Sequence, residues 1–168
     1  MGSEEVGRHM KNGIIALVWM ALAGVTGCAP AMIQGSSVEA TPENLEVWNQ
    51  VEEYRISLEE RDPKRLMGLI SREYFDNFAT TDRSEDDYGY AKLEEKMAPV
   101  LRSNAKKVRM NIRLTQIRIV GDTAEADFEY SARFLLSDNG RDVWETRQDF
   151  NRLVFAREQN QWRIIEGL

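Results

Sequence analysis

The side chains in this sequence that could transfer a proton or hold a ligand are mostly tyrosines and carboxylates. Tyr54 and Tyr130 recur with apolar neighbours at the spacing of a helix and of a strand, so we expect their rings to face an interior. Glu166 lies between Ile164 and Leu168 on a strand-like apolar face. A phenol beside a carboxylate can stabilise an oxyanion or move a proton. The candidate pocket residues are Tyr54, Tyr74, Tyr130, Gln148, Arg152 and Glu166.

Two of these candidates come from a single strand pattern. Gln148 lies between Trp144 and Phe150 on an apolar face, and Arg152 follows on the same face. Buried polar groups need partners, so we expect Arg152 to pair with Glu166 across the last two strands. This pair could either stabilise the sheet or line a pocket, and the sequence leaves both interpretations open.

The N-terminal segment contains an apolar run that ends at a cysteine. Arg8 and Lys11 precede the apolar residues 14–23, and the run Gly-Val-Thr-Gly-Cys closes the segment at Cys28. The apolar run is shorter than the roughly 20 residues of a transmembrane helix and fits the roughly 7–15 residues of a signal peptide. The arrangement resembles the signal peptide and lipobox of bacterial lipoproteins.

This resemblance implies an anchor and a place in the cell. In bacterial lipoproteins the cysteine takes a diacylglyceryl group, the chain is cut before it, and the new amino terminus is acylated, for example with palmitate. We therefore expect a cleaved signal peptide at residues 1–27 and a lipidated Cys28 in the cell envelope. Two or three acyl chains hold a protein on a membrane, whereas one chain binds reversibly. Ala29 follows the cysteine instead of Asp, which implies the outer membrane, facing the periplasm, in a Gram-negative organism. Met1 and Met10 both remain open as the start.

The remaining chain lacks the side chains of several common active sites. The only histidine is His9, inside the expected signal peptide, and the only cysteine is Cys28. This excludes Ser-His-Asp and Cys-His nucleophilic catalysis, thiolate or imidazole zinc sites, and disulfides within residues 29–168. The net charge of −6 without a basic cluster argues against nucleic-acid binding. We expect no cofactor and no metal.

A flexible tether and two helices are predicted at the start of the mature chain. Residues 28–40 are small and polar without periodicity, which predicts the lipidated Cys and a flexible tether. Thr41 followed by Pro42 is a typical helix start, and apolar residues recur at helical spacing until about Arg61. Asp62 followed by proline starts a second, short helix.

A third helix is predicted from Ser84 to Leu101. Its first turn is acidic, which favours a helix N-terminus, and Pro99 should kink or shorten its last turn. The acidic residues lack the Gly and Glu positions of a calcium-binding loop, so we do not expect a cation there. They are Asp82, Glu85, Asp86 and Asp87.

The second half of the chain alternates between apolar and polar residues, which is the period of β-strands. The phase shifts at Thr115-Gln116, which predicts a bulge. Gly121-Asp122, Asn139-Gly140 and Asn160 mark turns, the second being a strong hairpin signal. The outward positions are charged and predict a solvated face: Arg113, Arg118, Glu125, Asp127, Glu129 and Arg133. Helices followed by about four antiparallel strands make an α+β fold.

Residues 43–168 resemble the nuclear transport factor 2-like (NTF2-like), or SnoaL-like, cone fold. The resemblance rests on the long first helix, Arg61-Asp62-Pro63, the aromatic Tyr74-Phe75, the strand meander and the closing Gln161-Trp162-Arg163-Ile164. It implies one domain at residues 41–168, with three N-terminal helices packed on a curved antiparallel sheet. It also implies an apolar pocket on the concave face of that sheet.

A fold of this kind does not imply one function. Dehydratase-type relatives use a His-Asp pair, which this chain cannot supply. Our first hypothesis is a non-catalytic envelope lipoprotein that binds a partner protein or a small apolar ligand. One alternative is an isomerase or lyase that uses Tyr54 or Tyr130 with a carboxylate, although both tyrosines could simply be core residues.

Another alternative is a structural accessory subunit of an envelope assembly, marked by exposed aromatic residues in the range 74–78. A homodimer through the charged sheet face also remains open. An open pocket with a carboxylate near a tyrosine favours the enzyme, and a pocket filled by Trp48, Phe128 or Trp144 excludes it.

Overall fold

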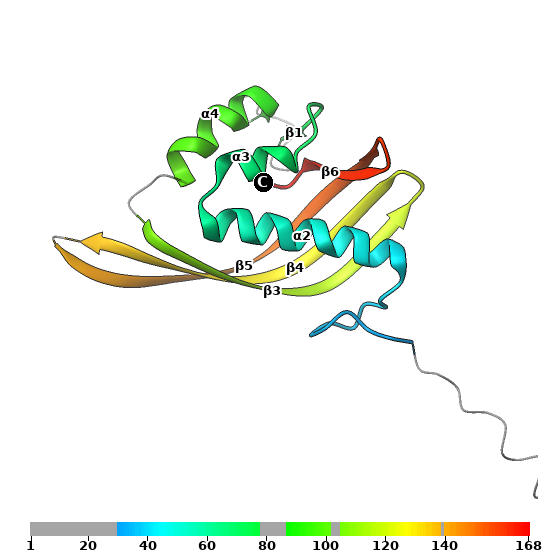
Figure 1. Cartoon of the computed structure of the whole chain (residues 1–168), viewed down its shortest axis with the longest axis horizontal. Coiled ribbons are helices and arrows are strands. Elements are labelled where there is room, and N and C mark those ends of the chain that lie inside the picture. Colours follow the sequence, from blue (N-terminus) through cyan, green and yellow to red (C-terminus); the bar gives the residue numbers. More distant parts are fainter. Residues whose placement is uncertain (1–29, 78–86, 102–104, 139) are drawn as a thin grey trace, which may run out of the picture. The chain divides into compact units, whose positions relative to one another are not determined.

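The computed structural model describes residues 30–77, 87–101, 105–138 and 140–168, and Ala31–Leu168 forms a compact unit of its own. Within the described residues this unit has three helices and two antiparallel sheets (Figure 1), so the predicted α+β class is confirmed. The expected signal peptide and Cys28 lie outside the described residues. None of the helices described is long and apolar enough to cross a membrane.

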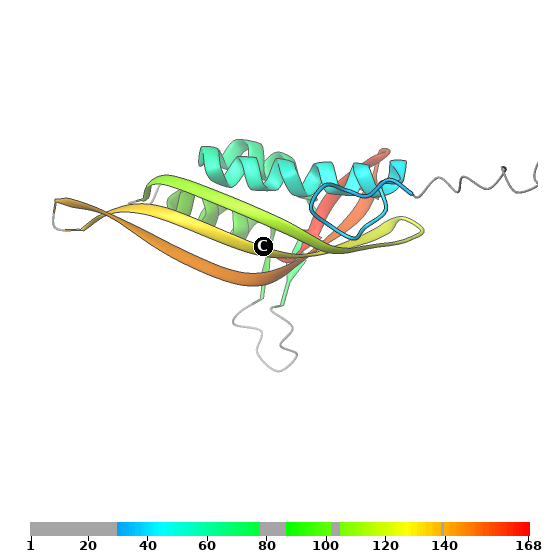
Figure 2. The same ribbon diagram turned by 90° about the horizontal axis from the view of Figure 1, so that it is seen from below.

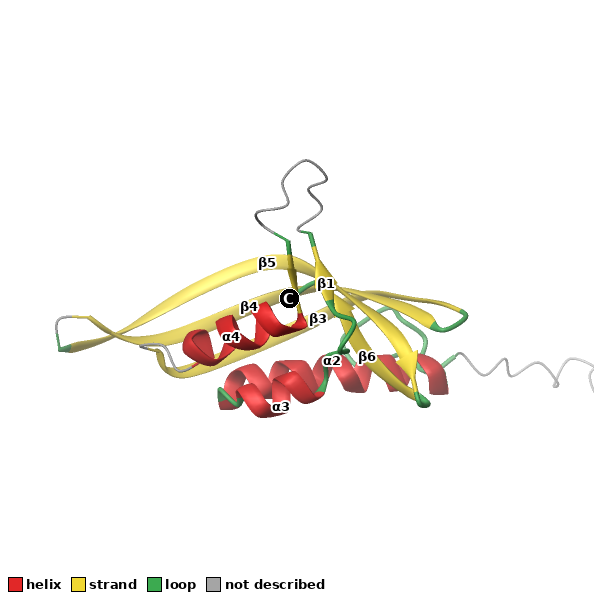
Figure 3. Cartoon of the chain, turned by 90° about the horizontal axis from the view of Figure 1, so that it is seen from above, coloured by secondary structure: helices red, strands yellow, loops and turns green. Residues whose placement is uncertain are grey.

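The elements follow one another as helices, a small sheet, a helix and a long meander (Figure 3). They are α2 (Pro42–Glu60), α3 (Pro63–Gly68), β1 (Phe75–Asp76), β2 (Tyr88–Gly89), α4 (Tyr90–Leu101), β3 (Ala105–Val120), β4 (Thr123–Asp138), β5 (Arg141–Glu158) and β6 (Gln161–Glu166).

Both predicted helix starts are confirmed by their caps. The Thr41 hydroxyl accepts a hydrogen bond from the Asn44 amide at 3.1 Å, and the Asp62 carboxylate accepts one from the Arg65 amide at 3.0 Å. Each cap satisfies an amide that has no partner within its helix. Arg61 ends α2 in the left-handed conformation, with φ of 55°, which turns the chain sharply into α3.

The main sheet has the strand order β3-β4-β5-β6, with every neighbouring pair antiparallel. The register between β3 and β4 shifts at Leu114/Gln116, which confirms the predicted bulge. Asp138 pairs with Arg141, so β4 and β5 are joined by the tight hairpin that the sequence indicates. β6 pairs only with the last part of β5, from Val154 on, so the first half of β5 is an edge of the described sheet.

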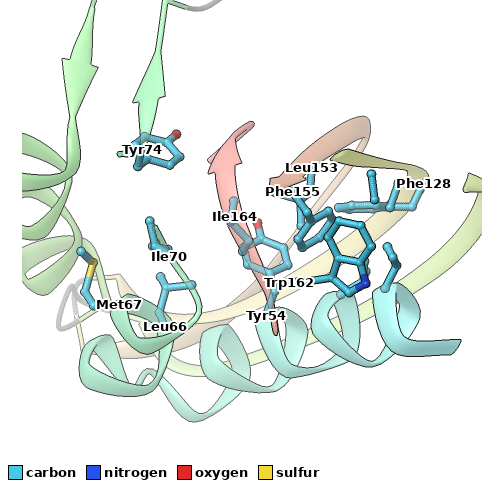
Figure 4. Close-up of a cluster of buried hydrophobic side chains, with 14 of the residues drawn as sticks. Tyr54, Leu66, Met67, Ile70, Tyr74, Phe128, Leu153, Phe155, Trp162 and Ile164 are labelled. Carbon is cyan, nitrogen blue, oxygen red and sulfur yellow. The ribbon is translucent and has the colours of Figure 1, made fainter. Parts of the chain in front are cut away.

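The helices cover one face of this sheet, and the core lies between the two layers (Figures 1 and 2). Side chains alternate between the two faces of a strand, so the even positions of β4 point inward and the odd positions outward. Figure 4 shows part of the core, in which the ring of Tyr54 projects from α2 among the strands. The largest fully buried apolar side chains are Phe128, Phe155, Leu66, Leu93, Leu153, Ile164, Val47 and Val51.

The predicted start of the third helix is wrong. α4 begins at Tyr90 rather than Ser84, because Tyr88 and Gly89 instead pair with β1 as a short strand. Asp82, Glu85 and Asp86 lie outside the described residues. Pro99 lies inside α4, which continues to Leu101. The missing amide of a proline costs little near the end of a helix that stops within two residues.

The predicted tether is also wrong for residues 31–40. Met32 and Glu39 form a β-bridge, and the Ala40 amide donates to the Ala31 carbonyl at 2.7 Å. The Ile33 side chain is only 3% exposed and belongs to the core. Val38 and Ala40 also pack against the core, and burial of a side chain such as Ile33 contributes roughly 1.5–3 kcal/mol to holding this segment in place.

Candidate functional site

A cavity of about 670 Å³ lies between the helices and the concave face of the sheet. Its size is in the range of small-molecule sites, which are roughly 300–1,000 Å³. The residues around it come from α2 and its C-cap, β1, α4, all four strands of the main sheet and the segment after β6: Tyr54, Leu58, Arg61, Asp76, Leu101, Ala105, Val108, Met110, Tyr130, Ala132, Phe134, Asp149, Phe150, Asn151, Glu166, Gly167 and Leu168.

The strand register divides this cavity into an apolar end and a polar end. Val108 pairs with Phe134 at the apolar end, which Leu58 and Leu101 also line. Tyr130 precedes Phe134 by four residues on β4 and pairs with Asp149. We refer to the region around Asp76, Asp149 and Glu166 as the carboxylate end. A molecule in the cavity would therefore meet hydrocarbon on one side and carboxylates on the other.

Tyr54 lines the cavity with a largely buried side chain. Its side chain is 8% exposed, and its hydroxyl has no hydrogen-bond partner among the described residues. Burial raises the pKa of Tyr54 above its ordinary value, and the neighbouring Tyr130 adds to this shift. The hydroxyl therefore stays protonated at neutral pH and is available as a hydrogen-bond donor.

Tyr130 and Asp149 place a second phenol beside a carboxylate. They are direct partners across β4 and β5, and both side chains face the helices. One Asp149 oxygen accepts a hydrogen bond from the Phe150 amide at 2.8 Å. Directly opposed residues in an antiparallel pair have Cβ atoms about 4.5–5.5 Å apart, so the two side chains can act on one ligand group.

A hydrogen-bond network fixes the segment after β6 against the cavity. The Tyr74 hydroxyl donates to the Asp76 carboxylate at 3.0 Å, and the same carboxylate accepts from the Gly167 amide at 3.1 Å. The Asn151 side chain donates to the Gly167 carbonyl at 3.0 Å. Burial raises the pKa of Tyr74, and the neighbouring carboxylate of Asp76 contributes to this shift. Asp76 thus has a structural role in holding one wall of the cavity.

The charged groups around the cavity are mainly acidic. Three carboxylates, those of Asp76, Asp149 and Glu166, face one guanidinium, that of Arg61. The Arg61 guanidinium donates to the carbonyl of Ala105, where β3 begins, at the apolar end. A negative potential therefore concentrates at the carboxylate end.

The structure brings together three of the six predicted pocket residues and separates the others. Tyr54, Tyr130 and Glu166 line the cavity, and Tyr74 lies behind its wall, bonded to Asp76. Gln148 and Arg152 are wrong as cavity residues. They point to the outer face of the sheet because they pair with odd positions of β4.

The expected ion pair between Arg152 and Glu166 is replaced by another. Arg152 instead pairs with Asp127 at 2.5 Å and with Glu125 at 3.6 Å. The outer face carries further ion pairs, including Arg118 with Glu125 at 3.2 Å. The prediction of a charged, solvated outer face is confirmed.

Asp76, Asp149 and Asn151 line the cavity but were not predicted from the sequence. The hairpin at Asn139-Gly140 could have predicted that Asp149 and Asn151 face the cavity, because it sets the register between β4 and β5. A two-residue loop sets odd positions of β5 opposite even positions of β4, which places Asp149 beside Tyr130. The exposed Trp144 and Phe150 suggested the opposite face instead.

The described residues contain no cluster of His, Cys, Asp or Glu that could hold a metal ion. Tyr74 is buried, and Phe75 is 53% exposed, so among the described residues the expected aromatic patch consists of one side chain there.

Comparisons with known proteins identify the fold. No family model and no curated protein matches the sequence. Among solved structures, a candidate dehydratase of the NTF2-like family from Streptomyces avermitilis is 12% identical, with a TM-score of 0.60 over 74% of this chain and 92% of that one. A candidate calcium/calmodulin-dependent protein kinase II association domain from Xanthomonas campestris is 20% identical, with a TM-score of 0.58 over 83% and 91%.

An NTF2-like superfamily protein from Salmonella enterica is also 20% identical, with a TM-score of 0.55 over 73% of this chain and 86% of that one. These similarities show that the folded unit has the NTF2-like fold, with its curved antiparallel sheet. At such identities they carry no statement about activity.

Proposed function

We propose that this domain binds one small, mostly apolar molecule in its cavity, and that a lipid on Cys28 holds it at a membrane. The observation that carries the binding proposal is the open cavity that Tyr54 lines with its hydroxyl. This hydroxyl has no hydrogen-bond partner among the described residues. A polar ligand atom in the cavity could donate to the oxygen of this hydroxyl or accept from its O–H group.

The three side chains that could have filled this cavity lie elsewhere. Phe128 is part of the core, Trp144 is 42% exposed on the outer side of β5, and Trp48 packs against the core from α2. None of them is among the cavity-lining residues. The space is therefore available to a ligand.

The raised pKa of Tyr54 and the hydrogen bonds that already occupy Asp76 favour binding over catalysis. An acid or base works best when its pKa lies near the working pH, whereas burial moves that of Tyr54 away from neutrality. Asp76 is already bound to Tyr74 and to the Gly167 amide. These groups are suited to orienting a ligand.

A blocked cavity tests the binding proposal. The full chain carrying Cys28→Ser, kept free of detergent, would be titrated with the neutral apolar fluorophore N-phenyl-1-naphthylamine. Ala132→Phe places a ring in the cavity and should abolish the fluorescence increase, whereas Ser131→Phe, on the other face of β4, should preserve it. Equal fluorescence from both variants would refute cavity binding.

The anchor is supported by the sequence up to Cys28 and by the early start of the folded unit. Only Ala29 and Pro30 separate Cys28 from Ala31, where the compact unit begins. Each residue spans at most about 3.6 Å, so the domain would stand within about 10 Å of a lipid at Cys28. Apolar molecules accumulate in membranes, so a domain anchored in this way would meet them.

Cell fractionation tests the anchor. Cys28→Ser should move the protein from the membrane to the soluble fraction, because no thiol remains for acylation. Ser37→Ala, a change in the loop that follows, should leave it with the membrane. A Cys28→Ser protein that stays with the membrane would contradict the anchor and leave the binding proposal untouched.

A second function is favoured by the neighbouring Tyr130 and Asp149. A carboxylate base and a phenol donor in one cavity could remove a proton next to a carbonyl, as an isomerase or lyase does. Incubation with an unsaturated cyclic ketone in deuterium oxide tests this function. Deuterium incorporation that Asp149→Asn abolishes would establish it, and incorporation at the uncatalysed rate would exclude it for that ketone.

A further inference from the structure

Resting on the proposed ligand binding, we infer that the cavity selects apolar molecules with a positively charged nitrogen and rejects those with a carboxylate. The polar groups that a ligand head would meet are arranged for a cation. They lie at the carboxylate end, and the apolar lining of Leu58, Val108 and Phe134 lies at the other.

The head of the ligand would lie at Tyr130 and Asp149. These two residues are opposed on the sheet, and Tyr54 reaches the same region from α2. Asp149 offers a carboxylate for a charge-assisted hydrogen bond. The two phenol rings offer their faces, which attract cations, and phenol oxygens can also accept hydrogen bonds from an ammonium group.

The single guanidinium of the cavity does not reverse this preference. Arg61 is bound to the Ala105 carbonyl at the apolar end. A fatty acid that placed its carboxylate at the polar end would meet Asp149 and Glu166. If it turned around, its hydrocarbon tail would lie against those carboxylates. Both orientations are unfavourable for an anion, whereas an amine fits the cavity in one orientation.

The cavity thus combines an acidic end with a tyrosine, Tyr54, whose hydroxyl has no hydrogen-bond partner among the described residues. The Tyr54 side chain as a whole is 8% exposed, and it lines the same space. An alkylammonium group has three donors and no acceptor, so its partners must be carboxylate, carbonyl or phenol oxygens. The ligand class is therefore a hydrophobic amine rather than a fatty acid.

Three ligands that differ only in the head group test this inference. Calorimetric titration of the Cys28→Ser protein with decylamine, decanol and decanoate should give the tightest binding for the amine. One hydrogen bond to a charged group corresponds to about tenfold or more in affinity, so decanol should bind about tenfold more weakly, and decanoate more weakly still.

Two variants that each remove one negative charge test which carboxylate causes the preference for the amine. Asp149→Asn should remove most of the preference for decylamine over decanol. Glu145→Gln lies on the same strand and faces the same side, but it does not line the cavity, so the preference should persist. Loss of the preference in both variants would mean that general charge attraction is responsible, and would overturn the inference.

The outcomes separate this inference from the binding proposal on which it rests. Equal binding of the amine and the alcohol, or tighter binding of the carboxylate, would overturn the charge selectivity and leave cavity binding intact. No binding of any of the three ligands, together with no response to the neutral fluorophore, would refute both.

Discussion

Tyr130 and Asp149 are paired directly across β4 and β5, and both side chains line the cavity under α2. The turn between β4 and β5 sets this pairing, because it fixes the register of the two strands. Asp138 and Arg141 close the hairpin, and the same register continues without a shift to Tyr130 and Asp149. The outcome is a phenol and a carboxylate that can act on the same ligand.

Removal of the Tyr54 hydroxyl should weaken ligand binding without unfolding the protein. Its oxygen makes no hydrogen bond among the described residues, so Tyr54→Phe costs the folded state little. A neutral hydrogen bond contributes about 0.5–1.5 kcal/mol, so decylamine affinity should fall by about 2- to 12-fold. Calorimetric titration measures this change. Tyr90→Phe, outside the cavity, is the control, and equal losses in both variants would rule out a role for Tyr54.

Stability should decrease above about pH 10. Burial raises the pKa values of Tyr54, Tyr74 and Tyr88 in the folded protein, whereas tyrosines in the unfolded chain ionise near about 10. The unfolded state then loses protons that the folded state keeps, so this stability is complete below about pH 10 and is lost as the pH rises further. Urea unfolding at several alkaline pH values measures the slope. Tyr54→Phe should make it shallower, and an unchanged midpoint up to about pH 11 would contradict the shifts.

Gly167 should tolerate no side chain. Its φ is 101°, and a Cβ atom there would lie 2.0 Å from the main-chain oxygen of Arg152. Gly167→Ala should therefore displace the segment that Asp76 and Asn151 hold, with a loss of about 2–3 kcal/mol in the free energy of unfolding. Chemical denaturation measures this loss. Gly68→Ala has open space and an ordinary φ, so it should be neutral or slightly stabilising. Similar losses for both glycines would mean that the close approach at Gly167 is not rigid.

Ile33 should stabilise the whole domain, although it precedes the first helix. Ile33→Ala removes a side chain that is 3% exposed and should cost about 2–4 kcal/mol. Met32→Ala, next to it and 51% exposed, should cost almost nothing. Thermal unfolding of the two variants checks the difference. Equal midpoints would support a flexible tether through residue 40.

The helix caps, the strand periodicity and the bulge could be read from the sequence because they depend on local chemistry. Thr41 and Asp62 are capping residues followed by proline, and the register shift at Leu114/Gln116 follows from a change of phase. The short strand at Tyr88 could not be predicted, because two residues carry no periodicity and pair only through the tertiary fold.

The candidate site was half predictable for a similar reason. Tyr54 and Tyr130 follow from periodicity, whereas Gln148 was assigned to the inner face because Trp144 and Phe150 flank it. Both aromatic side chains are exposed at the unpaired edge of β5, and Phe150 is 74% exposed. Hydrophobicity therefore gave the wrong face, and the hairpin register would have given the right one. Asp76 depends on a contact with Gly167 that is distant in sequence.

Native mass spectrometry with decylamine tests the central claim most directly. The Cys28→Ser protein and its Ala132→Phe derivative would each be mixed with the amine and measured without denaturation. We predict one bound molecule on the first protein and none on the second, because the phenyl ring fills the cavity. Equal occupancy of the two proteins, or no bound molecule on either, would contradict a ligand-binding cavity.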